Sequence, residues 1–439
     1  MADQNHAVQA MPASRPPPGV STGPLAWAKA NLFSGVISTI VTLLLAYLIV
    51  SLVWTLLDWL VFNGIWARGP ENNPAEPCRQ TYGFCYAYLE TNWSAILFGV
   101  YPGEERWRPG IAVVLILGLI VLSALPRFWS RKLILAWYIA AVAAAILMYG
   151  GEISWATVFW IVMIGAPIIR LLMPRTRINS NPVAFGLSGF ALVWIALALI
   201  QIVLSTLGLS PLSTGGIDTG LEHVGNRSWG GLPITLGLAL IGCGVAFPIG
   251  IVLALGRRSQ MPAIRFVCVI YIEFIRGVPL ITILFMATFL FPLFMPEGVN
   301  IDNLLRAQVG MILFAAAYLA EVVRGGLQAI PKGQFEAAQS MGLTYWQSMR
   351  LIILPQALKI SIPPLVNTFI GFYKDTTLVL IIGIYDLLAS ARATTTDSAW
   401  QGFYPEAYAV VAVIYFITCF GMSKYSQWIE RRTDTTHRR

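Results

Sequence analysis

Residues 36–57 read VISTIVTLLLAYLIVSLVWTLL, an apolar run without a charged side chain. A helix needs about 20 apolar residues to cross a hydrocarbon layer about 30 Å thick, so this run is long enough to span a membrane. A membrane β-barrel would instead show short segments in which apolar and polar residues alternate. The stretch therefore indicates an α-helical membrane protein.

The composition of the whole chain supports the same fold class. Of the 439 residues, 57% are hydrophobic and 11% are charged, whereas soluble chains are about 25% charged. This excludes a soluble enzyme, a disordered protein and a fibrous protein. We expect an all-α polytopic membrane protein with about ten transmembrane helices. They are placed at 36–57, 110–126, 133–149, 153–173, 183–209, 232–256, 266–295, 305–323, 360–383 and 407–423.

The basic residues predict the orientation of these helices, because Lys and Arg collect on the cytoplasmic side of membrane spans. If the N-terminus is inside, the inside segments hold 20 of the 29 Lys and Arg residues and the outside segments hold 7. We therefore expect both the N- and the C-terminus to be cytoplasmic. The net charge of +8 is explained by this asymmetry, and we expect no nucleic-acid partner.

The residues that carry chemistry in enzymes are sparse. The three His residues do not cluster, which argues against a metal site, and no G-x-x-x-x-G-K-[ST] string is present for binding ATP. No loop or span combines a nucleophile, a base and an orienting group. We therefore expect a chain that is not an enzyme and that carries no metal or cofactor.

Two cysteines lie seven residues apart in the outside loop 58–109, within the string CRQTYGFC. An oxidising compartment would let Cys78 and Cys85 form a disulfide. The alternative is that they are two unrelated loop cysteines.

The inside segment 324–359 is longer than the other inside connections and contains helix signals. Pro331 suits the first position of a helix, and Gly342 suits its termination. Thr344 and Gln347 form a capping-box pattern that opens a second helix, which extends to Pro355. We predict a short helix–turn–helix between two membrane spans.

The surface of this helix–turn–helix has the character of a docking element. Ala337 and Ala338 give a low helix face that another backbone can approach closely, and Phe335, Tyr345 and Trp346 offer rigid apolar anchors. The alternative is a helix that lies on the bilayer surface. The residues alone favour neither interpretation.

A resemblance to a known family distinguishes the two. Glu336-Ala337-Ala338, three residues, Gly342, nine residues and Ile352-x-Leu354-Pro355 resembles the E-A-A loop of ABC-importer permeases. Three further strings look like the His/Glu/Gln-type permeases for polar amino acids, at 229–236, 271–280 and 374–379. The extra N-terminal spans and the cysteine pair are most similar to the M-type subunits of general L-amino-acid permeases.

The resemblance covers about 229–429, with five spans, and implies a division of the chain. The predicted parts are a flexible cytoplasmic tail 1–35, an N-terminal membrane extension 36–220 with the periplasmic loop 58–109, a five-helix permease core 221–429 with the coupling loop 324–359, and a cytoplasmic tail 430–439. The resemblance assigns no role to the stretch 153–220.

In this family the loop helix inserts into a cleft on a separate ATPase subunit. The resemblance therefore implies an ATPase-coupling element made of Glu336, Ala337, Ala338, Gly342, Leu354 and Pro355. It further implies a permease in the bacterial inner membrane that imports L-amino acids through the lipid bilayer. Its partners would be two ABC ATPase subunits, a homologous second permease subunit and a periplasmic amino-acid-binding protein.

Charged residues inside membrane spans are costly and are functional candidates by default. Glu273 and Arg276 are three residues apart on one helix and can pair. Such an ion pair would fix the kink at 277–279, and a direct role in the substrate path is the alternative.

Lys374 and Asp375 are a second candidate, because adjacent helical residues point about 100° apart and need not neutralise each other. A zwitterionic amino acid needs a cation for its carboxylate and an anion for its ammonium group. We therefore expect Lys374, Asp375, Thr376 and Asn367 to line a substrate path. A structural network that also includes Thr377 is the alternative.

Two other classes of membrane protein compete with this reading. An ion-coupled secondary transporter often has an inverted repeat, and no repeat is evident here, nor would such a carrier need the loop 324–359. A non-transporting membrane scaffold would usually carry a soluble signalling domain, and no inside segment is long enough to fold as one.

Overall fold

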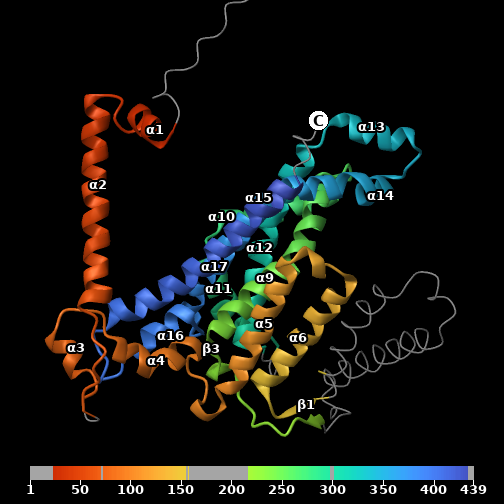
Figure 1. Ribbon diagram of the computed structural model, residues 1–439. Coiled ribbons are helices and arrows are strands. Elements are labelled where there is room, and N and C mark those ends of the chain that lie inside the picture. The colour runs from red at the N-terminus through yellow and green to blue at the C-terminus, as the bar shows by residue number, and fades with distance from the viewer. Residues whose placement is uncertain (1–22, 71–72, 155–156, 158–215, 297–300, 434–439) are drawn as a thin grey trace, which may run out of the picture. The chain divides into compact units, whose positions relative to one another are not determined.

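The computed structural model describes residues 23–70, 73–154, 157, 216–296 and 301–433 (Figure 1). The predicted spans 153–173 and 183–209 lie almost wholly outside the described residues. The chain forms two compact units, Met1–Ala87 and Tyr88–Arg439. The predicted boundary near residue 220 stays a prediction.

The first unit contains the long helix α2 (Val36–Leu57), which a π-helical turn η1 (Asp58–Phe62) extends. A short helix, α1 (Pro24–Asn31), precedes it. None of the side chains of α2 is buried. A helix that is apolar on every face suits a lipid environment, as the sequence predicts for residues 36–57.

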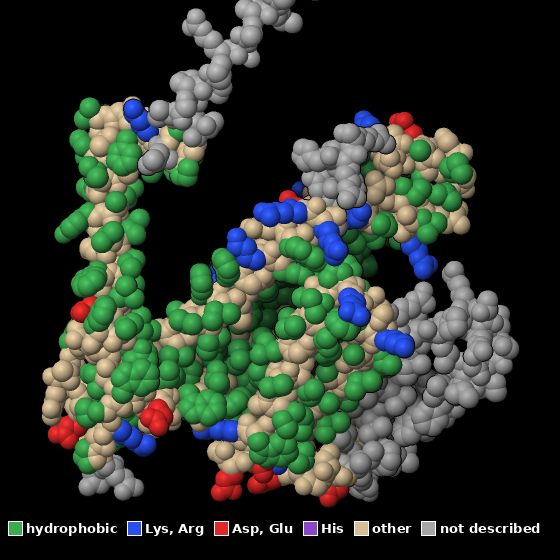
Figure 2. Space-filling view, in the orientation of Figure 1, with side chains coloured by type: hydrophobic (Ala, Val, Ile, Leu, Met, Phe, Trp, Pro, Cys, Tyr) green, Lys and Arg blue, Asp and Glu red, His purple; other side chains and the backbone are tan. Residues whose placement is uncertain are grey.

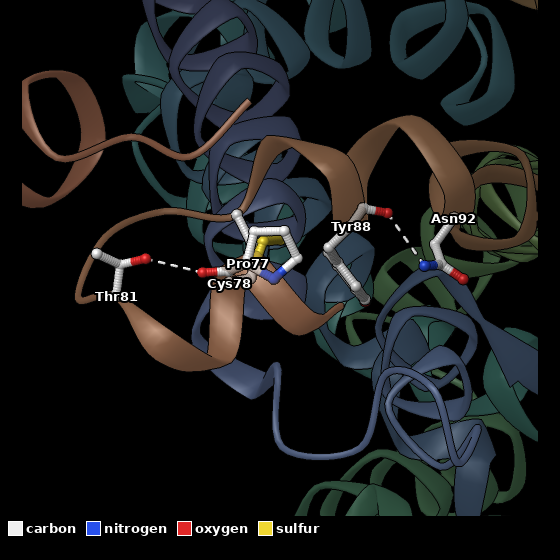
Figure 3. The surroundings of a disulfide bond; sticks show 6 residues. Pro77, Cys78, Thr81, Tyr88 and Asn92 are labelled. Carbon is white, nitrogen blue, oxygen red and sulfur yellow. Dashed lines mark hydrogen bonds between the residues drawn. A yellow bond between two sulfur atoms is a disulfide. The ribbon is translucent and has the colours of Figure 1, made fainter. Parts of the chain in front are cut away.

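The predicted loop after this span contains a disulfide. Cys78, in α3 (Glu76–Gln80), is bonded to Cys85, and their Cα atoms are 5.6 Å apart. Figure 3 shows Cys78 with the neighbouring Thr81 hydroxyl, which donates to the Pro77 carbonyl oxygen at 2.8 Å. The structure thus contains the predicted bond rather than two unrelated cysteines.

The boundary between the two units falls within α4 (Tyr86–Phe98), after its first two residues. The sequence did not predict this helix. A 3₁₀ turn η2 (Gly103–Glu105) leads to α5 (Trp107–Ala124). A second 3₁₀ turn, η3 (Pro126–Phe128), joins α5 to α6 (Arg131–Tyr149). Both α5 and α6 fall on predicted spans, and they pack side by side (Figure 1).

In chain order, the described helices after residue 231 are α9 (Leu232–Arg257), α10 (Pro262–Gly277), α11 (Leu280–Phe285), η5 (Met286–Leu290), η6 (Phe291–Phe294), α12 (Asn303–Gln328), α13 (Lys332–Ser340), α14 (Tyr345–Ser348), η7 (Met349–Ile353), α15 (Leu354–Asp375), η8 (Thr376–Ile382), α16 (Leu387–Thr394) and α17 (Tyr404–Thr433). The larger hydrophobic core is built from buried side chains of α9, α10, α11, α12, η7, α15 and η8.

Helix α12 is the centre of this core and packs against α9, α10 and α15. Its contact with α9 depends on Gly250. A Cβ atom at Gly250 would lie 2.9 Å from the Cβ of Leu319 and 3.1 Å from the nitrogen of Ala320. The absent side chain therefore lets two helix backbones approach closely, which is typical of helix packing in membranes.

The predicted fold class is confirmed. Seven described helices are long and apolar enough to cross a membrane, or eight if the bent pair α10–α11 is one span. These eight fall on the eight predicted spans outside 153–209. The break in the bent pair is at Val278–Pro279, where the helices turn by 102°, close to the predicted kink.

Among the described residues, two pairs of very short strands are the exception to an all-α fold. β1 (Glu152–Ser154) pairs antiparallel with β2 (Gly216–Asp218). β3 (Gly230–Gly231) pairs parallel with β4 (Tyr385–Asp386). Because each strand has only two or three residues, they act as local clamps between helices and do not form a sheet layer.

Charge is unevenly distributed over the second unit. In Figure 2, Lys and Arg side chains gather toward the end that carries α13 and α14, and acidic side chains gather near β1 at the opposite end. This distribution follows the predicted asymmetry of the loops. Which end is cytoplasmic stays a prediction.

Candidate functional site

The predicted coupling loop is a pair of short helices, α13 and α14, that joins α12 to α15. Pro331 is the residue before α13 rather than its first residue. Gly342 ends α13 with a φ of +69°, a conformation that glycine adopts without strain. The nitrogen of Gly342 bonds to the oxygen of Gln339, and that of Leu343 to Ala338. These two bonds form a Schellman motif, which satisfies the last carbonyl groups of the helix.

The two faces of α13 have different environments. Phe335 is half-buried against the core, and Ala338 is fully buried. Glu336 and Ala337 are exposed. This corrects the prediction that both alanines form an open docking face, because one turn of α13 is needed to attach the helix to its own chain. Of the two alanines, only Ala337 is exposed.

The predicted capping box at the start of α14 is present. The Thr344 hydroxyl accepts from the Gln347 nitrogen at 3.5 Å, and the Gln347 side-chain oxygen accepts from the Thr344 nitrogen at 2.9 Å. Beside it, Tyr345 and Trp346 contact each other edge to face and are exposed. Together with the exposed Met341 and Leu351 they form an apolar patch, which we call the α14 patch.

The second helix does not stop at Pro355. The π turn η7 passes directly into α15, and Pro355 is the second residue of that helix. The candidate span therefore runs from Tyr345 to Ile382, instead of starting at residue 360. Leu354 is half-buried and packs on the core, and Pro355 is exposed.

The predicted ion pair between Glu273 and Arg276 is replaced by contacts with other helices. Glu273 pairs with Arg257 of α9 at 2.7 Å. Arg276 lies 3.6 Å from Glu321 of α12. Glu321 also pairs with Arg257 and Arg324, both at 2.8 Å. The charges thus connect α9, α10 and α12, which a spacing rule for one helix could not foresee.

The predicted substrate-path residues separate into two environments. Lys374 and Asn367 are exposed and lie two turns apart, on one face of α15. Thr376 is fully buried, and its hydroxyl donates to the Tyr373 oxygen. Asp375 is half-buried. Lys374 and Asn367 therefore lie on the same exposed face of α15, whereas Thr376 is buried and forms a hydrogen bond with the last turn of α15.

Sequence reasoning missed the short helix α16 and its cap, Asp386. This fully buried carboxylate accepts from the nitrogens of Ala389 at 2.9 Å and Leu388 at 3.1 Å. Burial raises the pKa of the Asp386 carboxyl, against the lowering effect of these hydrogen bonds. An Asp followed by an apolar run is a helix-start signal, so the sequence held a clue to α16.

Within the described part of the chain, no group of three His, Cys, Asp or Glu side chains could hold a metal ion.

Comparison with known proteins extends beyond the loop motif. Residues 246–435 match the family described as "Binding-protein-dependent transport system inner membrane component". The chain is 41% identical over 421 residues to the inner membrane amino-acid ABC transporter permease protein YhdY of Escherichia coli, covering 96% of each chain. It is 39% identical over 455 residues to the glutamate/glutamine/aspartate/asparagine transport system permease protein BztC of Rhodobacter capsulatus, covering 100% of both. The likeness therefore includes the N-terminal extension.

Proposed function

The chain belongs to the family of binding-protein-dependent transport system inner membrane components and is an amino-acid ABC transporter permease, and from this premise we propose that α13 and α14 couple it to a separate ATPase subunit. The ATPase hydrolyses ATP, and the permease converts the resulting motion into alternation between inward- and outward-facing states. Such coupling requires that the ATPase binds the two states with different affinity.

The observation that carries this proposal is the exposure of the loop. Glu336 and Ala337 are both exposed on α13, and Ser340 donates its hydroxyl to the Glu336 backbone oxygen. The α14 patch adds exposed apolar surface beside them, with Met341 78% and Trp346 69% exposed. Aromatic side chains and a small residue at a close-approach position suit a helix that inserts into a protein cleft.

The proposed assembly contains two ATPase subunits, a homologous second permease subunit and a periplasmic binding protein that delivers the substrate. The substrate is an L-amino acid. In this proposal Lys374 and Asn367, on their shared exposed face, contact the substrate on its path, with Lys374 as the cation for its carboxylate. Asp375 is the anion available for the ammonium group.

The test is amino-acid uptake and co-purification of the ATPase subunit in Ala337→Asp. A carboxylate forced unpaired into an interface costs about 3 kcal/mol or more, which weakens association at least about 100-fold. We expect uptake and co-purification to collapse while the level of the permease in the membrane is unchanged.

The matched control is Ser130→Asp, which places the same charge at an exposed residue before α6, where Asp also suits the cap position. It should leave uptake and co-purification unchanged. Normal uptake by Ala337→Asp would refute coupling through α13. Uptake that continues without ATP would instead favour an ion-coupled carrier.

A further inference from the structure

A basic pocket of about 470 Å³ lies where the ends of α9, α10 and α12 meet. Side chains from all three helix ends line it. These are Arg257 of α9 and Arg258, which directly follows α9, Arg265 and Val269 of α10, and Arg324 and Gln328 of α12. Four guanidinium groups thus line one cavity, and the charge balance around them decides what the cavity can hold.

Two carboxylates neutralise only part of this charge. Glu321 contacts Arg257 and Arg324 at 2.8 Å, and Arg276, outside the pocket, at 3.6 Å. Glu273 contacts Arg257 at 2.7 Å. Three guanidinium groups therefore share two carboxylates, and with Arg258 and Arg265 the cluster holds five guanidinium groups against two carboxylates, an excess of positive charge.

The excess charge is concentrated on Arg258 and Arg265. Arg258 donates to the Leu327 backbone oxygen at 2.9 Å and lies over the Phe335 ring at 5.7 Å, and neither contact neutralises it. The exposed Arg265 guanidinium makes no hydrogen bond or ion pair with any residue that the structure describes. Both groups remain available to an anion.

The surface of α10 beside the pocket is apolar and exposed. Phe266 and Phe274 are each 66% exposed, Val267 is 64% exposed and Ile270 is 50% exposed. α10 belongs to a bent pair of helices that together are long and apolar enough to form one membrane span. A cationic pocket therefore adjoins a surface that suits acyl chains.

We propose that this pocket binds the phosphate head group of an anionic phospholipid, whose acyl chains lie along the exposed face of α10. Bidentate contacts between guanidinium and phosphate oxygens are strong and directional, and basic pockets between membrane helices are suited to lipid head groups. The lipid would connect α9, α10 and α12 at the end where Arg258 contacts Phe335 of α13. This inference concerns a different surface from the coupling face of α13, and its test does not require transport.

The experiment is native mass spectrometry of the purified transporter complex in detergent, titrated with phosphatidylglycerol or with zwitterionic phosphatidylcholine. One basic residue near an anionic lipid is worth about 1 kcal/mol, or about a fivefold change in affinity. Arg265→Gln should weaken phosphatidylglycerol binding about fivefold, and Arg265→Glu about thirtyfold. Because Arg265 has no side-chain partner in the described chain, both variants should fold.

The matched control is Arg127→Gln, which removes the same charge from an exposed residue of η3. It should bind phosphatidylglycerol as the wild type does. Equal binding in wild type and Arg265→Glu, or equal binding of the two lipids, would overturn the proposal. A second experiment uses inorganic phosphate in place of the lipid. If phosphate alone, at the same concentration, protects the complex from thermal unfolding, the pocket binds a soluble anion and the lipid assignment is overturned.

A third outcome concerns the ATPase. Lipid that binds the permease alone but is displaced in the full complex would show that the ATPase occupies the pocket, and would also overturn the proposal.

Discussion

The second unit contains two short connecting helices of nearly equal length with opposite environments. α13 has nine residues and joins α12 to the span 345–382. α16 has eight residues and joins the same span to α17. In α13 only Ala338 is buried, whereas α16 buries five side chains: Leu387, Ala389, Ser390, Ala391 and Thr394. Similar local structure therefore serves two purposes.

The contacts of α16 are complete within the chain. The Ser390 hydroxyl accepts from the Gly231 nitrogen at 3.0 Å, and the Leu387 nitrogen donates to the Thr235 hydroxyl at 3.0 Å. The Thr394 hydroxyl lies 2.5 Å from that of Tyr88. By contrast, the Gln334 side-chain oxygen of α13 accepts from the Gln356 side-chain nitrogen at 3.1 Å, and Glu336 and Ala337 are exposed. α13 therefore buries fewer of its side chains in its own chain than α16 does.

The largest predicted effect tests the boundary between the two faces of α13. Ala338→Asp places a carboxylate at a fully buried position, which costs about 3–5 kcal/mol when the charge is unpaired. We expect a large loss of thermal stability and of protein in the membrane. Ala337→Asp, the same change one residue earlier, should unfold like the wild type because Ala337 is exposed. Equal stability of the two variants would show that α13 does not pack as described.

The second prediction compares two aspartates that cap helices. Asp386 is fully buried and caps α16. Asp302 is exposed and caps α12, where it accepts from the Leu304 nitrogen at 2.8 Å and the Leu305 nitrogen at 3.4 Å. Asp302→Ala should cost about 1 kcal/mol. Asp386→Ala should cost about 2–3 kcal/mol, because its uncovered N–H groups are out of reach of water.

The free energy of unfolding in detergent, followed by tryptophan fluorescence, distinguishes the two caps. Asp386→Asn retains one acceptor and should lose less stability than Asp386→Ala. Because burial raises the Asp386 pKa above its unfolded value, the wild type loses stability as the pH rises through the folded-state pKa. The difference in free energy of unfolding between wild type and Asp386→Asn should become smaller as the pH rises from the unfolded-state pKa to the folded-state pKa of Asp386. Equal losses in Asp386→Ala and Asp302→Ala would contradict the burial of α16.

Local signals in the sequence were sufficient for the features that depend on nearby residues. Apolar runs located the eight described spans, and Gly342 and the Thr344–Gln347 pattern located the ends of α13 and α14. Each of these features is determined by residues within a few positions of one another, so a single sequence carries the information.

The features that sequence reasoning missed depend on distant residues. Glu273 forms an ion pair with Arg257, sixteen positions away, and Arg257 also pairs with Glu321, sixty-four positions away. The burial of Ala338 likewise depends on how α13 packs against η7 and α14. Spacing on one helix cannot choose between such partners, because the choice is made by helix packing. α16 lies between the predicted spans 360–383 and 407–423, and no apolar run marks it, because it is stabilised by burial rather than by its own apolar length.

The smallest predicted effect concerns α14, whose cap is exposed. Thr344→Ala removes the hydroxyl of the capping box, which is worth about 1 kcal/mol. Since α14 has only four residues and carries the exposed Tyr345 and Trp346, this loss should stay local. Protection of the amides of 345–348 from hydrogen exchange should fall about fivefold, while the global free energy of unfolding is unchanged. Thr344→Ser keeps the acceptor and should retain the protection. If Thr344→Ala instead lowered the global free energy of unfolding as much as Asp386→Ala does, α14 would unfold together with the core. The exposed helix α14 would then be as strongly coupled to the core as the buried helix α16.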